Sequence, residues 1–140
     1  MFWFGDLNYR IEMEREDAKQ LIERQEWRSL YPHDQLLVER EEGRVFEGFM
    51  EPPIYFPPTY KYDPGTDDFD TSEKCRIPAW CDRILYKGDD ISPLLYRSHP
   101  ECLSSDHKPI TAWFSIVVQE HDMKKRLAEV SICKQIRIAN

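Results

Sequence analysis

The chain has 140 residues, 41% of them hydrophobic, and its 19 basic and 26 acidic side chains give a net charge of −7. This length is typical of one folded domain, and the hydrophobic fraction argues against a disordered tail. The negative charge excludes general coating of nucleic acid, which needs a basic surface, and no apolar run approaches the ~20 residues of a membrane-spanning helix.

The first predicted element is a buried strand over residues 2–4, which begins without a polar lead-in and runs into Gly5 and Asp6. A signal peptide does not have this pattern, and we expect further natural sequence upstream of Met1. A polar-faced helix is expected over residues 15–28, from its short apolar stripe.

A second helix is expected to begin after an N-cap at Asp34 and to stop at Gly43. Prolines and aromatics alternate over residues 45–64, which predicts an ordered, extended loop. The segment over residues 83–86 is short and apolar enough for a buried strand, and alternation of period two predicts a strand over 110–118.

A terminal helix is expected near residues 123–130, within a C-terminal helical extension over residues 119–140 that has no assigned role. Strands and helices that mix without a regular βαβ rhythm favour an α+β layered fold. The cysteines show no C-x-x-C pairing, so we expect free thiols rather than a zinc knuckle or a disulfide framework; they are Cys75, Cys81, Cys102 and Cys133.

Three polar clusters lie at strand ends, and the first has the sequence Gly-Asp-Leu-Asn-Tyr-Arg over residues 5–10. On an extended backbone Asp6 and Asn8 would point the same way, because they are two residues apart. A carboxylate beside a carboxamide can orient a water, take its proton and hydrogen-bond an anionic group. The alternative is an Asx-turn that ends the strand.

The second cluster is Pro-Ala-Trp-Cys-Asp-Arg-Ile-Leu over residues 78–85. Asp82 and Arg83 enter an apolar strand, where an unpaired charge is costly, so each is expected to have a dedicated partner. The alternative is an interaction of Asp82 with an arginine that merely closes the strand end.

The third cluster, Ser-Ser-Asp-His-Lys-Pro-Ile over residues 104–110, precedes the strand predicted over 110–118. Asp106 and His107 are suited to a metal, a base or a phosphate contact, and the alternative is a polar turn. If the clusters converge, one carboxylate can hold a histidine nitrogen while the other nitrogen faces a phosphate. The set has no P-loop and no H-E-x-x-H motif, and it favours metal-assisted hydrolysis of a phosphate ester.

These clusters, in this order, resemble the signature motifs of the inositol polyphosphate 5-phosphatases, most closely the type II group. Residues 58–63 and 70–76 also match the family's pattern, and the resemblance covers about residues 2–118. It implies half of a four-layered α/β sandwich of the deoxyribonuclease-I-like (endonuclease/exonuclease/phosphatase) superfamily. Residues 1–118 would then be the C-terminal half of a catalytic domain.

The resemblance also implies site roles. Asp6 would position and deprotonate the attacking water, and Asn8 would hydrogen-bond the reacting phosphoryl group. Asp82 would orient His107, which would contact the scissile phosphate, and Asp106 would support a Mg²⁺ ion. The 4-phosphate of the ring would be held by a further set, namely Tyr60, Lys61, Lys74 and Arg76.

Three neighbouring residues have less defined roles. Arg83 and Lys108 would either strengthen the positive field of the pocket or neutralise its carboxylates. Cys81 is expected to be a packing residue, because in-line attack by water needs no thiol.

The implied activity is Mg²⁺-dependent hydrolysis of the 5-phosphate of phosphoinositides such as phosphatidylinositol 4,5-bisphosphate. The protein would act in the cytoplasm, at the surface of membranes that contain these lipids, and no nucleic-acid partner is expected. The family's N-terminal motifs, which hold an Asn and a Glu for the metal and another histidine, do not occur in the chain. We therefore expect the chain alone to be inactive and to expose apolar residues on its inner face. The alternatives are a nuclease or sphingomyelinase of the same superfamily, or a non-catalytic product that binds lipid or a partner.

Overall fold

A computed structural model describes residues 1–118, so the predicted extension over residues 119–140 lies outside the described residues. Along this part of the chain the elements are β1 (Phe2–Asp6), α1 (Arg15–Glu23), α2 (Trp27–Leu30), a 3₁₀ turn (Tyr31–His33), α3 (Gln35–Glu41), β2 (Asp82–Tyr86), β3 (Ile91–Ser98) and β4 (Ile110–Ile116). None of these helices has the length and apolar character needed to cross a membrane.

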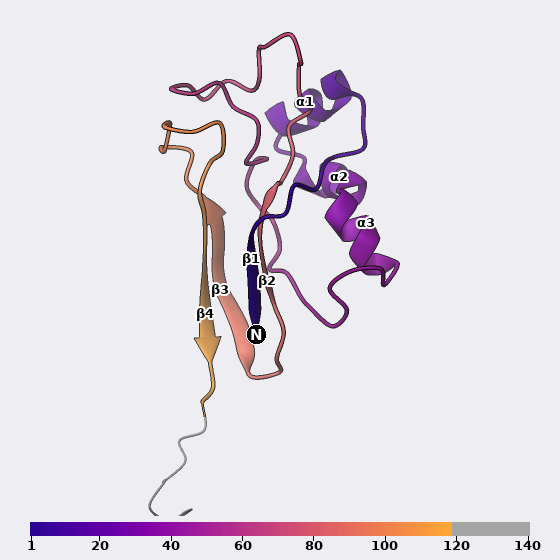
Figure 1. Cartoon of the computed structure of the whole chain (residues 1–140), viewed down its shortest axis with the longest axis vertical. Helices are drawn as coiled ribbons and strands as arrows, with labels where there is room; N and C mark the ends of the chain where they lie inside the picture. Colours follow the sequence, from indigo (N-terminus) through magenta and orange to yellow (C-terminus); the bar gives the residue numbers. More distant parts are fainter. Residues whose placement is uncertain (119–140) are drawn as a thin grey trace, which may run out of the picture.

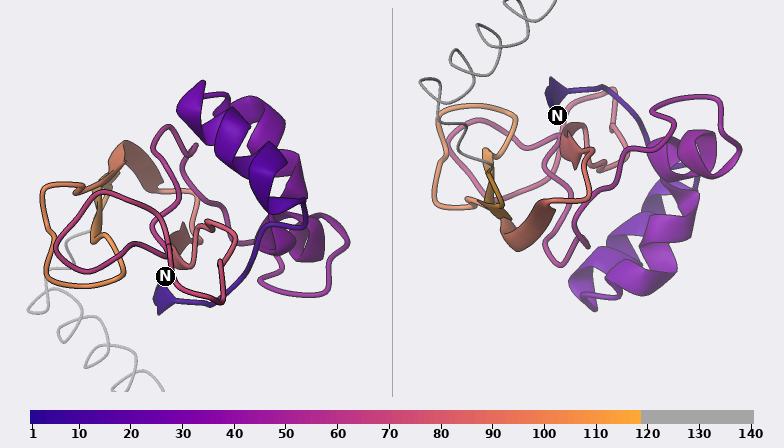
Figure 2. Two further views of the ribbon diagram at one scale, coloured as in Figure 1. Left: turned by 90° about the horizontal axis from the view of Figure 1, so that it is seen from above. Right: turned by 90° about the horizontal axis from the view of Figure 1, so that it is seen from below.

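The strands form two antiparallel pairs, β1 with β2 and β3 with β4. In Figure 1 the helices lie on one side of the β1–β2 pair, and the β3–β4 pair lies on the other. The views along the long axis in Figure 2 show the same separation. This layered mixture of strands and helices confirms the predicted α+β class. The loops that follow β1 and β3, and those that precede β2 and β4, gather at one end of the molecule (Figure 1).

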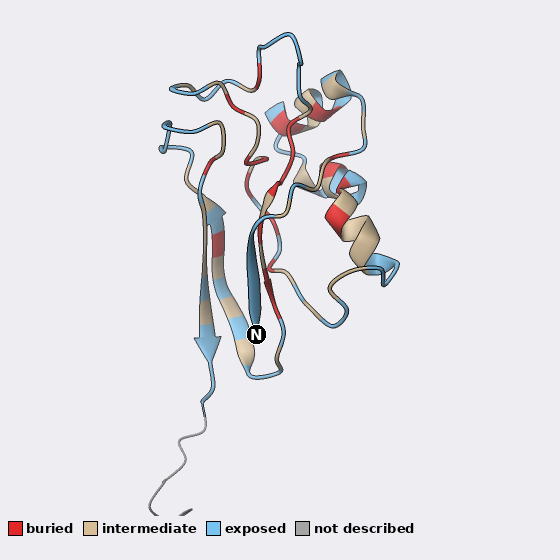
Figure 3. Cartoon of the chain, in the orientation of Figure 1, coloured by how far each residue is buried: buried red, intermediate tan, exposed pale blue. Residues whose placement is uncertain are grey.

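The core lies between the helices, the proline-rich segment and β2 (Figure 3). Trp80 is fully buried, and its indole N–H donates a hydrogen bond of 3.0 Å to the carbonyl oxygen of Phe56. That bond satisfies the one polar group of the largest core side chain. Ile54 and Phe56 are also buried, so the segment over residues 45–64 is ordered, as predicted, although it contains no regular helix or strand.

The helix predicted over residues 15–28 is divided in two by Gln25, whose φ is +56°. The N–H of Gln25 donates to the carbonyl of Ile22, and the N–H of Glu26 donates to that of Leu21. These two bonds form a Schellman motif, which closes a helix with a residue in the left-handed conformation, usually glycine. The break was not predicted because glutamine, unlike glycine, is not a typical signal for the end of a helix.

The predicted N-cap of α3 is confirmed, because a carboxylate oxygen of Asp34 accepts a 2.9 Å hydrogen bond from the N–H of Leu37. The helix ends at Glu41, and Gly43 follows with a φ of +68°. Strand β3 was not predicted. It contains Pro93, which cannot donate to a ladder, and its register shifts between Pro93 and Leu95.

Strand β1 occurs where it was predicted, but it is not buried. All five of its residues are exposed, and Phe4 retains 72% of its accessible surface. Within the described residues its only strand neighbour is β2. Trp113 of β4 is also 62% exposed, so large apolar side chains are uncovered in the described part of the chain, as expected.

Candidate functional site

Two of the three polar clusters meet in the register of the β1–β2 pair. Asp6, the last residue of β1, lies directly opposite Asp82, the first residue of β2. Side chains of directly opposed residues share one face of a sheet, with Cβ atoms about 4.5–5.5 Å apart, and like charges in such a pair are unfavourable. The fold therefore places two carboxylates together at a strand end, an arrangement that favours the approach of a cation.

The third cluster joins them through His107. Its Nδ1 lies 3.0 Å from Oδ2 of Asp82, and the hydroxyl of Thr59 donates to the same oxygen at 2.7 Å. An ionised carboxylate only accepts, so the bonded Nδ1 carries the proton. The other ring nitrogen, Nε2, has no hydrogen-bond partner among the described residues and is available to a ligand.

Aromatic and cationic groups cover one side of this histidine. The ring of Tyr60 lies 4.6 Å from that of His107, and the guanidinium of Arg10 lies 4.6 Å from the centre of the Tyr60 ring. Tyr60 also forms isolated β-bridges with Ala79 and His107, which join the proline-rich segment to both neighbouring loops. The Tyr60 ring thus packs against the imidazole of His107, while the hydrogen bond to Asp82 fixes the direction in which Nδ1 points.

Asp6, Asp82 and His107 line one open cleft of about 300 Å³, together with Ser105. The side chains of Asp82 and His107 are 19% and 29% exposed, so a ligand can reach both. The predicted convergence of these three residues is therefore present.

Asn8 is positioned differently from the prediction. Its φ of +58° places it in the left-handed region, and its N–H donates to Oδ1 of Asp6 at 2.9 Å. The chain therefore forms the Asx-turn that was the alternative reading, rather than an extended backbone with parallel side chains. The carboxamide oxygen of Asn8 accepts a hydrogen bond from Arg10, and Asn8 is not among the residues that line the cleft.

Residues 1–118 contain no cluster of three or more His, Cys, Asp or Glu side chains that would hold a metal ion. Ca²⁺ takes six to eight oxygen ligands and Mg²⁺ takes six. Asp6 and Asp82 supply the right kind of oxygen, so the described residues fit part of a divalent-cation site. Asp106, whose carbonyl accepts from the N–H of Tyr62, does not line the cleft, and its role as a metal ligand stays a prediction.

Two of the residues predicted to bind a second phosphate, Lys61 and Arg76, contact Asp70, which is fully buried. Its carboxylate accepts hydrogen bonds from the N–H groups of Arg76 at 2.8 Å and Ser72 at 3.1 Å, and Lys61 Nζ lies 3.7 Å away. These contacts, led by the bond from Arg76, lower the pKa of Asp70 to about 2. The side chains of Lys74 and Arg76 are exposed and form no ion pair with another described residue.

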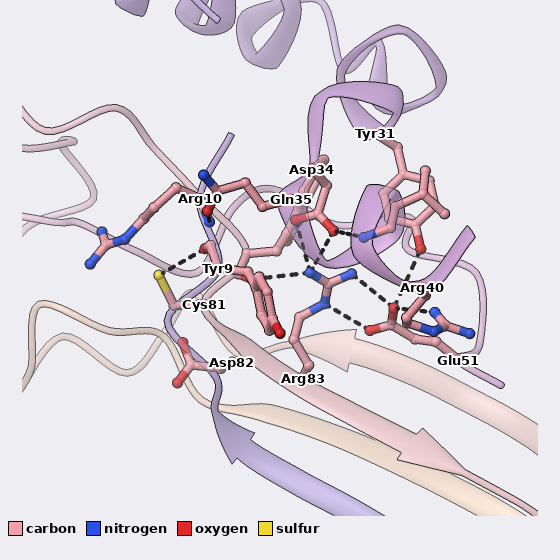
Figure 4. Close-up of polar contacts among 12 residues, drawn as sticks. Tyr9, Arg10, Tyr31, Asp34, Gln35, Arg40, Glu51, Cys81, Asp82 and Arg83 are labelled. Carbon is pink, nitrogen blue, oxygen red and sulfur yellow. Dashed lines mark hydrogen bonds and ion pairs between the residues drawn. The ribbon is translucent and has the colours of Figure 1, made fainter. Parts of the chain in front are cut away.

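Arg83 and Lys108 do not neutralise the carboxylates of the cleft. The Arg83 guanidinium binds Asp34 and Glu51 on the side of β2 away from Asp82 (Figure 4), so the alternative in which an arginine pairs with Asp82 is wrong for this residue. The ammonium of Lys108 binds Asp67.

Cys81 is fully buried, and burial raises the pKa of its thiol to about 12. The thiol stays protonated at neutral pH, which confirms a packing role. Cys75, Cys81 and Cys102 form no disulfide with one another, and Cys133 lies outside the described residues.

Two residues of the site were not singled out from the sequence. Thr59 shares Asp82 with His107, and Asp70 shapes the turn before Arg76. The Asp-Thr-Ser run at residues 70–72 is typical of a turn in which Asp accepts from the N–H two residues on, and it was a usable signal for Asp70. No sequence signal pointed to Thr59, because its role depends on contact with Asp82, which is 23 residues away.

Comparison with known proteins places these features in a family. The model of "Endonuclease/Exonuclease/phosphatase family 2" matches residues 1–113. The mouse type II inositol 1,4,5-trisphosphate 5-phosphatase is 51% identical over 134 residues, which cover 93% of this chain and 14% of that protein. Human synaptojanin-1 is 40% identical over 154 residues, which cover 90% of this chain and 10% of that protein.

Solved structures show the same relationship. The inositol polyphosphate 5-phosphatase domain of SPsynaptojanin, in complex with inositol (1,4)-bisphosphate and calcium ion, has a TM-score of 0.82 and 43% identity; the match covers 99% of this chain and 42% of that one. Cimex nitrophorin, solved as a ferrous NO complex, has a TM-score of 0.77 and 38% identity, over 84% of this chain and 41% of that one. The chain therefore spans less than half of the relatives that it matches, and this fold also occurs in a protein with a different ligand.

Proposed function

This chain belongs to the Endonuclease/Exonuclease/phosphatase family 2, and we propose that its cleft serves Mg²⁺-dependent hydrolysis of the 5-phosphate of phosphoinositides. One observation carries the proposal: His107 is held through Nδ1 by Asp82, in a cleft shared with Asp6. The resemblance to inositol polyphosphate 5-phosphatases is confirmed by relatives of that activity.

In the proposed reaction Asp6 orients the attacking water and takes its proton. Its exposed position at the end of β1 gives that carboxylate access to solvent. For this step His107 is doubly protonated: Nδ1–H stays bonded to Asp82, which stabilises the imidazolium, and Nε2–H donates to the scissile phosphate as negative charge develops. Asn8 would contact the phosphoryl group only after releasing Arg10, since its oxygen is engaged.

A bound Mg²⁺ would supply electrostatic stabilisation of the phosphate. Asp6, Asp82 and the predicted ligand Asp106 are the oxygen donors that this part of the chain offers. The solved relative holds calcium, which supports a divalent cation in the family without identifying magnesium.

The substrate is proposed to carry a second phosphate at ring position 4, held by Tyr60, Lys61, Lys74 and Arg76. Arginine grips phosphate oxygens with a planar fork, and lysine adds compact positive charge. The exposed side chains of Lys74 and Arg76 support this role, as does the inositol (1,4)-bisphosphate of the solved relative. A polynucleotide or a sphingomyelin headgroup offers no such second ring phosphate, so we favour the phosphoinositide over these alternatives.

We further propose that residues 1–118 supply only part of a working site and that the chain alone does not turn over substrate. No group of three or more His, Cys, Asp or Glu side chains among the described residues is arranged to hold a metal ion, and the chain matches only 42% of the solved 5-phosphatase domain; both observations support this. The partner it needs is then the other half of such a domain. A place at the cytoplasmic surface of phosphoinositide-containing membranes follows from the substrate and is part of the proposal.

The test is to graft this chain into the mouse type II relative in place of the segment to which it is 51% identical. Phosphate release from vesicles containing phosphatidylinositol 4,5-bisphosphate is measured with MgCl₂ for the chain alone and for the chimera. We expect release from the chimera, little from the chain alone, and loss of release in the chimera carrying His107→Ala. A folded chimera without activity, or one that is equally active with His107→Ala, would contradict the proposal.

A further inference from the structure

Each member of the Asp82–His107 pair is followed in sequence by a fully buried cation. Arg83 has no exposed surface, and Lys108 retains 1%. Cations are almost never fully buried unless they are paired, so each side chain must have a defined set of partners. Neither is part of the reaction proposed above.

Arg83 is held by four short hydrogen bonds (Figure 4). Nη1 lies 2.9 and 2.8 Å from the two oxygens of Asp34, and Nε and Nη2 each lie 2.8 Å from an oxygen of Glu51. Both acids are buried. Burial alone would lower the pKa of Arg83, but the two carboxylates outweigh it and keep the group charged. The arginine therefore ties β2 to the N-terminus of α3 and to the proline-rich segment.

Lys108 is held in a similar way from another direction. Its ammonium donates to Asp67 Oδ1 at 2.8 Å and to the carbonyl of Pro100 at 2.9 Å, with further contacts to the carbonyls of Thr66 and Cys102 at 3.3 and 3.4 Å. It also lies 4.7 Å from the centre of the Tyr62 ring. These contacts tie the loop that carries His107 to the loop over residues 62–70.

The geometry explains why these positions matter. In an extended chain successive side chains point to opposite faces. When the side chain of one residue is held on one face, its backbone is held too, and this limits the movement of the next residue, whose side chain is on the other face. Figure 4 shows Asp82 and Arg83 pointing apart in this way. Thr59 joins the two segments that carry these cations, because its carbonyl accepts from the N–H of Lys108 at 2.8 Å and its hydroxyl donates to Asp82, the neighbour of Arg83, at 2.7 Å.

We propose that Arg83 and Lys108 are positioning residues, which hold the backbone so that Nδ1–H of His107 stays bonded to Asp82 and Nε2 stays directed to the cleft; in the neutral ring this bond selects the Nδ1–H tautomer. A displacement of about 1 Å at such a pair is enough to weaken catalysis strongly. The catalytic purpose of this device rests on the proposed function. The orientation itself does not, because it is a property of the chain without substrate or metal.

The experiment uses the ¹⁵N-labelled 140-residue chain at a pH at which the imidazole is neutral. Long-range ¹H–¹⁵N spectra report which ring nitrogen of His107 carries the proton, and the spectrum of His107→Gln assigns its signals among the four histidines. Asp82→Ala gives the reference for a ring without its partner. The temperature of unfolding is measured for every variant.

Two variants remove the anchors without leaving the acids that pair with them buried, charged and unpaired. In Arg83→Met/Asp34→Asn/Glu51→Gln all three groups become neutral, a replacement that is often tolerated in protein cores. In Lys108→Met the partner Asp67 stays solvated, since its side chain is 70% exposed. Arg40→Met is the matched control, because Arg40 also contacts Glu51, at 3.5 Å, but is remote in sequence from Asp82.

We expect both variants to fold and to lose the single Nδ1–H tautomer, giving the mixed signals of Asp82→Ala, while Arg40→Met keeps it. Retention of the tautomer in the two folded variants would overturn the proposal. Failure of either variant to fold would show that its cation is a structural residue only, and mixed signals in Arg40→Met would show that general destabilisation is the cause. Because no substrate enters the measurement, an inactive chimera would leave this result unaffected.

Discussion

The ammonium of Lys61 lies 3.7 Å from Oδ1 of Asp70, whose other oxygen holds the backbone N–H of Arg76. One buried carboxylate therefore positions two of the cations proposed to bind the 4-phosphate. Arg15 reinforces this turn, because its guanidinium donates to the carbonyl of Asp70 at 2.7 Å. The loop proposed to bind phosphate is therefore shaped by contacts within the chain.

Asp70 should make stability depend on pH in the acid range. The pKa of Asp70 in the folded state is lowered to about 2, below its ordinary value of 3.8. The ionised carboxylate therefore stabilises the fold fully at a pH above 3.8, and this stabilisation is lost as the pH falls through about 2. Asp70→Asn should lower the free energy of unfolding at pH 7 by about 1–2 kcal/mol and flatten the loss between about pH 4 and pH 2. Urea unfolding across this range measures both effects. The exposed Asp68→Asn is the control, and an equal change in that variant would contradict a specific role for Asp70.

Arg76→Ala tests recognition of the second phosphate in the chimera. Loss of a bidentate, charge-assisted contact is worth roughly 1.5–3 kcal/mol, or about a 10- to 150-fold fall in kcat/KM. The fall should occur on substrates phosphorylated at positions 4 and 5 and be small on a ring without the 4-phosphate. Arg97→Ala, which removes an exposed arginine of β3, should have little effect on either. Equal losses on both substrates would leave only general electrostatic attraction.

Asp82→Asn should reduce turnover of the chimera by at least ~10²-fold, because an uncharged amide stabilises the charged ring poorly. His107→Ala and Asp6→Ala should be at least as damaging. Thr59→Val, which removes the 2.7 Å hydrogen bond to Asp82, should cost about 1 kcal/mol, or roughly fivefold. Steady-state kinetics measure these changes, with circular dichroism to verify folding. A well-folded Asp82→Asn chimera with a near-normal rate would show that the pair is misassigned.

The exposed apolar side chains should make the isolated chain self-associate. Phe4 and Trp113 are 72% and 62% exposed, and large exposed apolar groups favour association between copies. Phe4→Lys/Trp113→Lys should reduce association in sedimentation velocity and change the free energy of unfolding by only about 0.5 kcal/mol. Leu85→Ala, at a fully buried position, should cost about 2–5 kcal/mol and not reduce association. Unchanged association in the double variant would mean that another surface is responsible.

Local signals in the sequence were sufficient for several elements. Asp34 at the start of an apolar stripe predicted the cap of α3, and alternation over residues 110–118 predicted β4, which ends at Ile116. Failures occurred where a residue adopts an unusual backbone. Gln25 replaces the expected glycine at a helix end, and Pro93 lies inside a strand. Propensity argues against both, and tertiary packing overrides it.

The site was predictable to a similar extent. The motifs identified Asp6, Asp82 and His107, which do share a cleft, and the roles of the remaining predicted residues stay predictions. The partners of Arg83 could not be predicted, because Asp34 and Glu51 are 49 and 32 residues away in sequence. Such distant contacts leave no periodic signal.

The exposure of β1 also sets the order in which the molecule opens. Within the described residues this strand is held by β2, by the main-chain bonds of Met1 with Lys87 and by the bond from Leu7 to Cys81. The rings of Phe2 and Trp3 also contact those of Phe114 and Phe46, whereas β2 is anchored by a buried arginine. Segments with few buried contacts detach first and exchange their amide hydrogens fastest. The carboxylate that activates water in the proposed reaction therefore lies on a strand whose five residues are all exposed, and we expect Asp82 and His107 to stay paired when this strand detaches. Any surface that covers β1 would slow this local opening and keep the water-activating group in place.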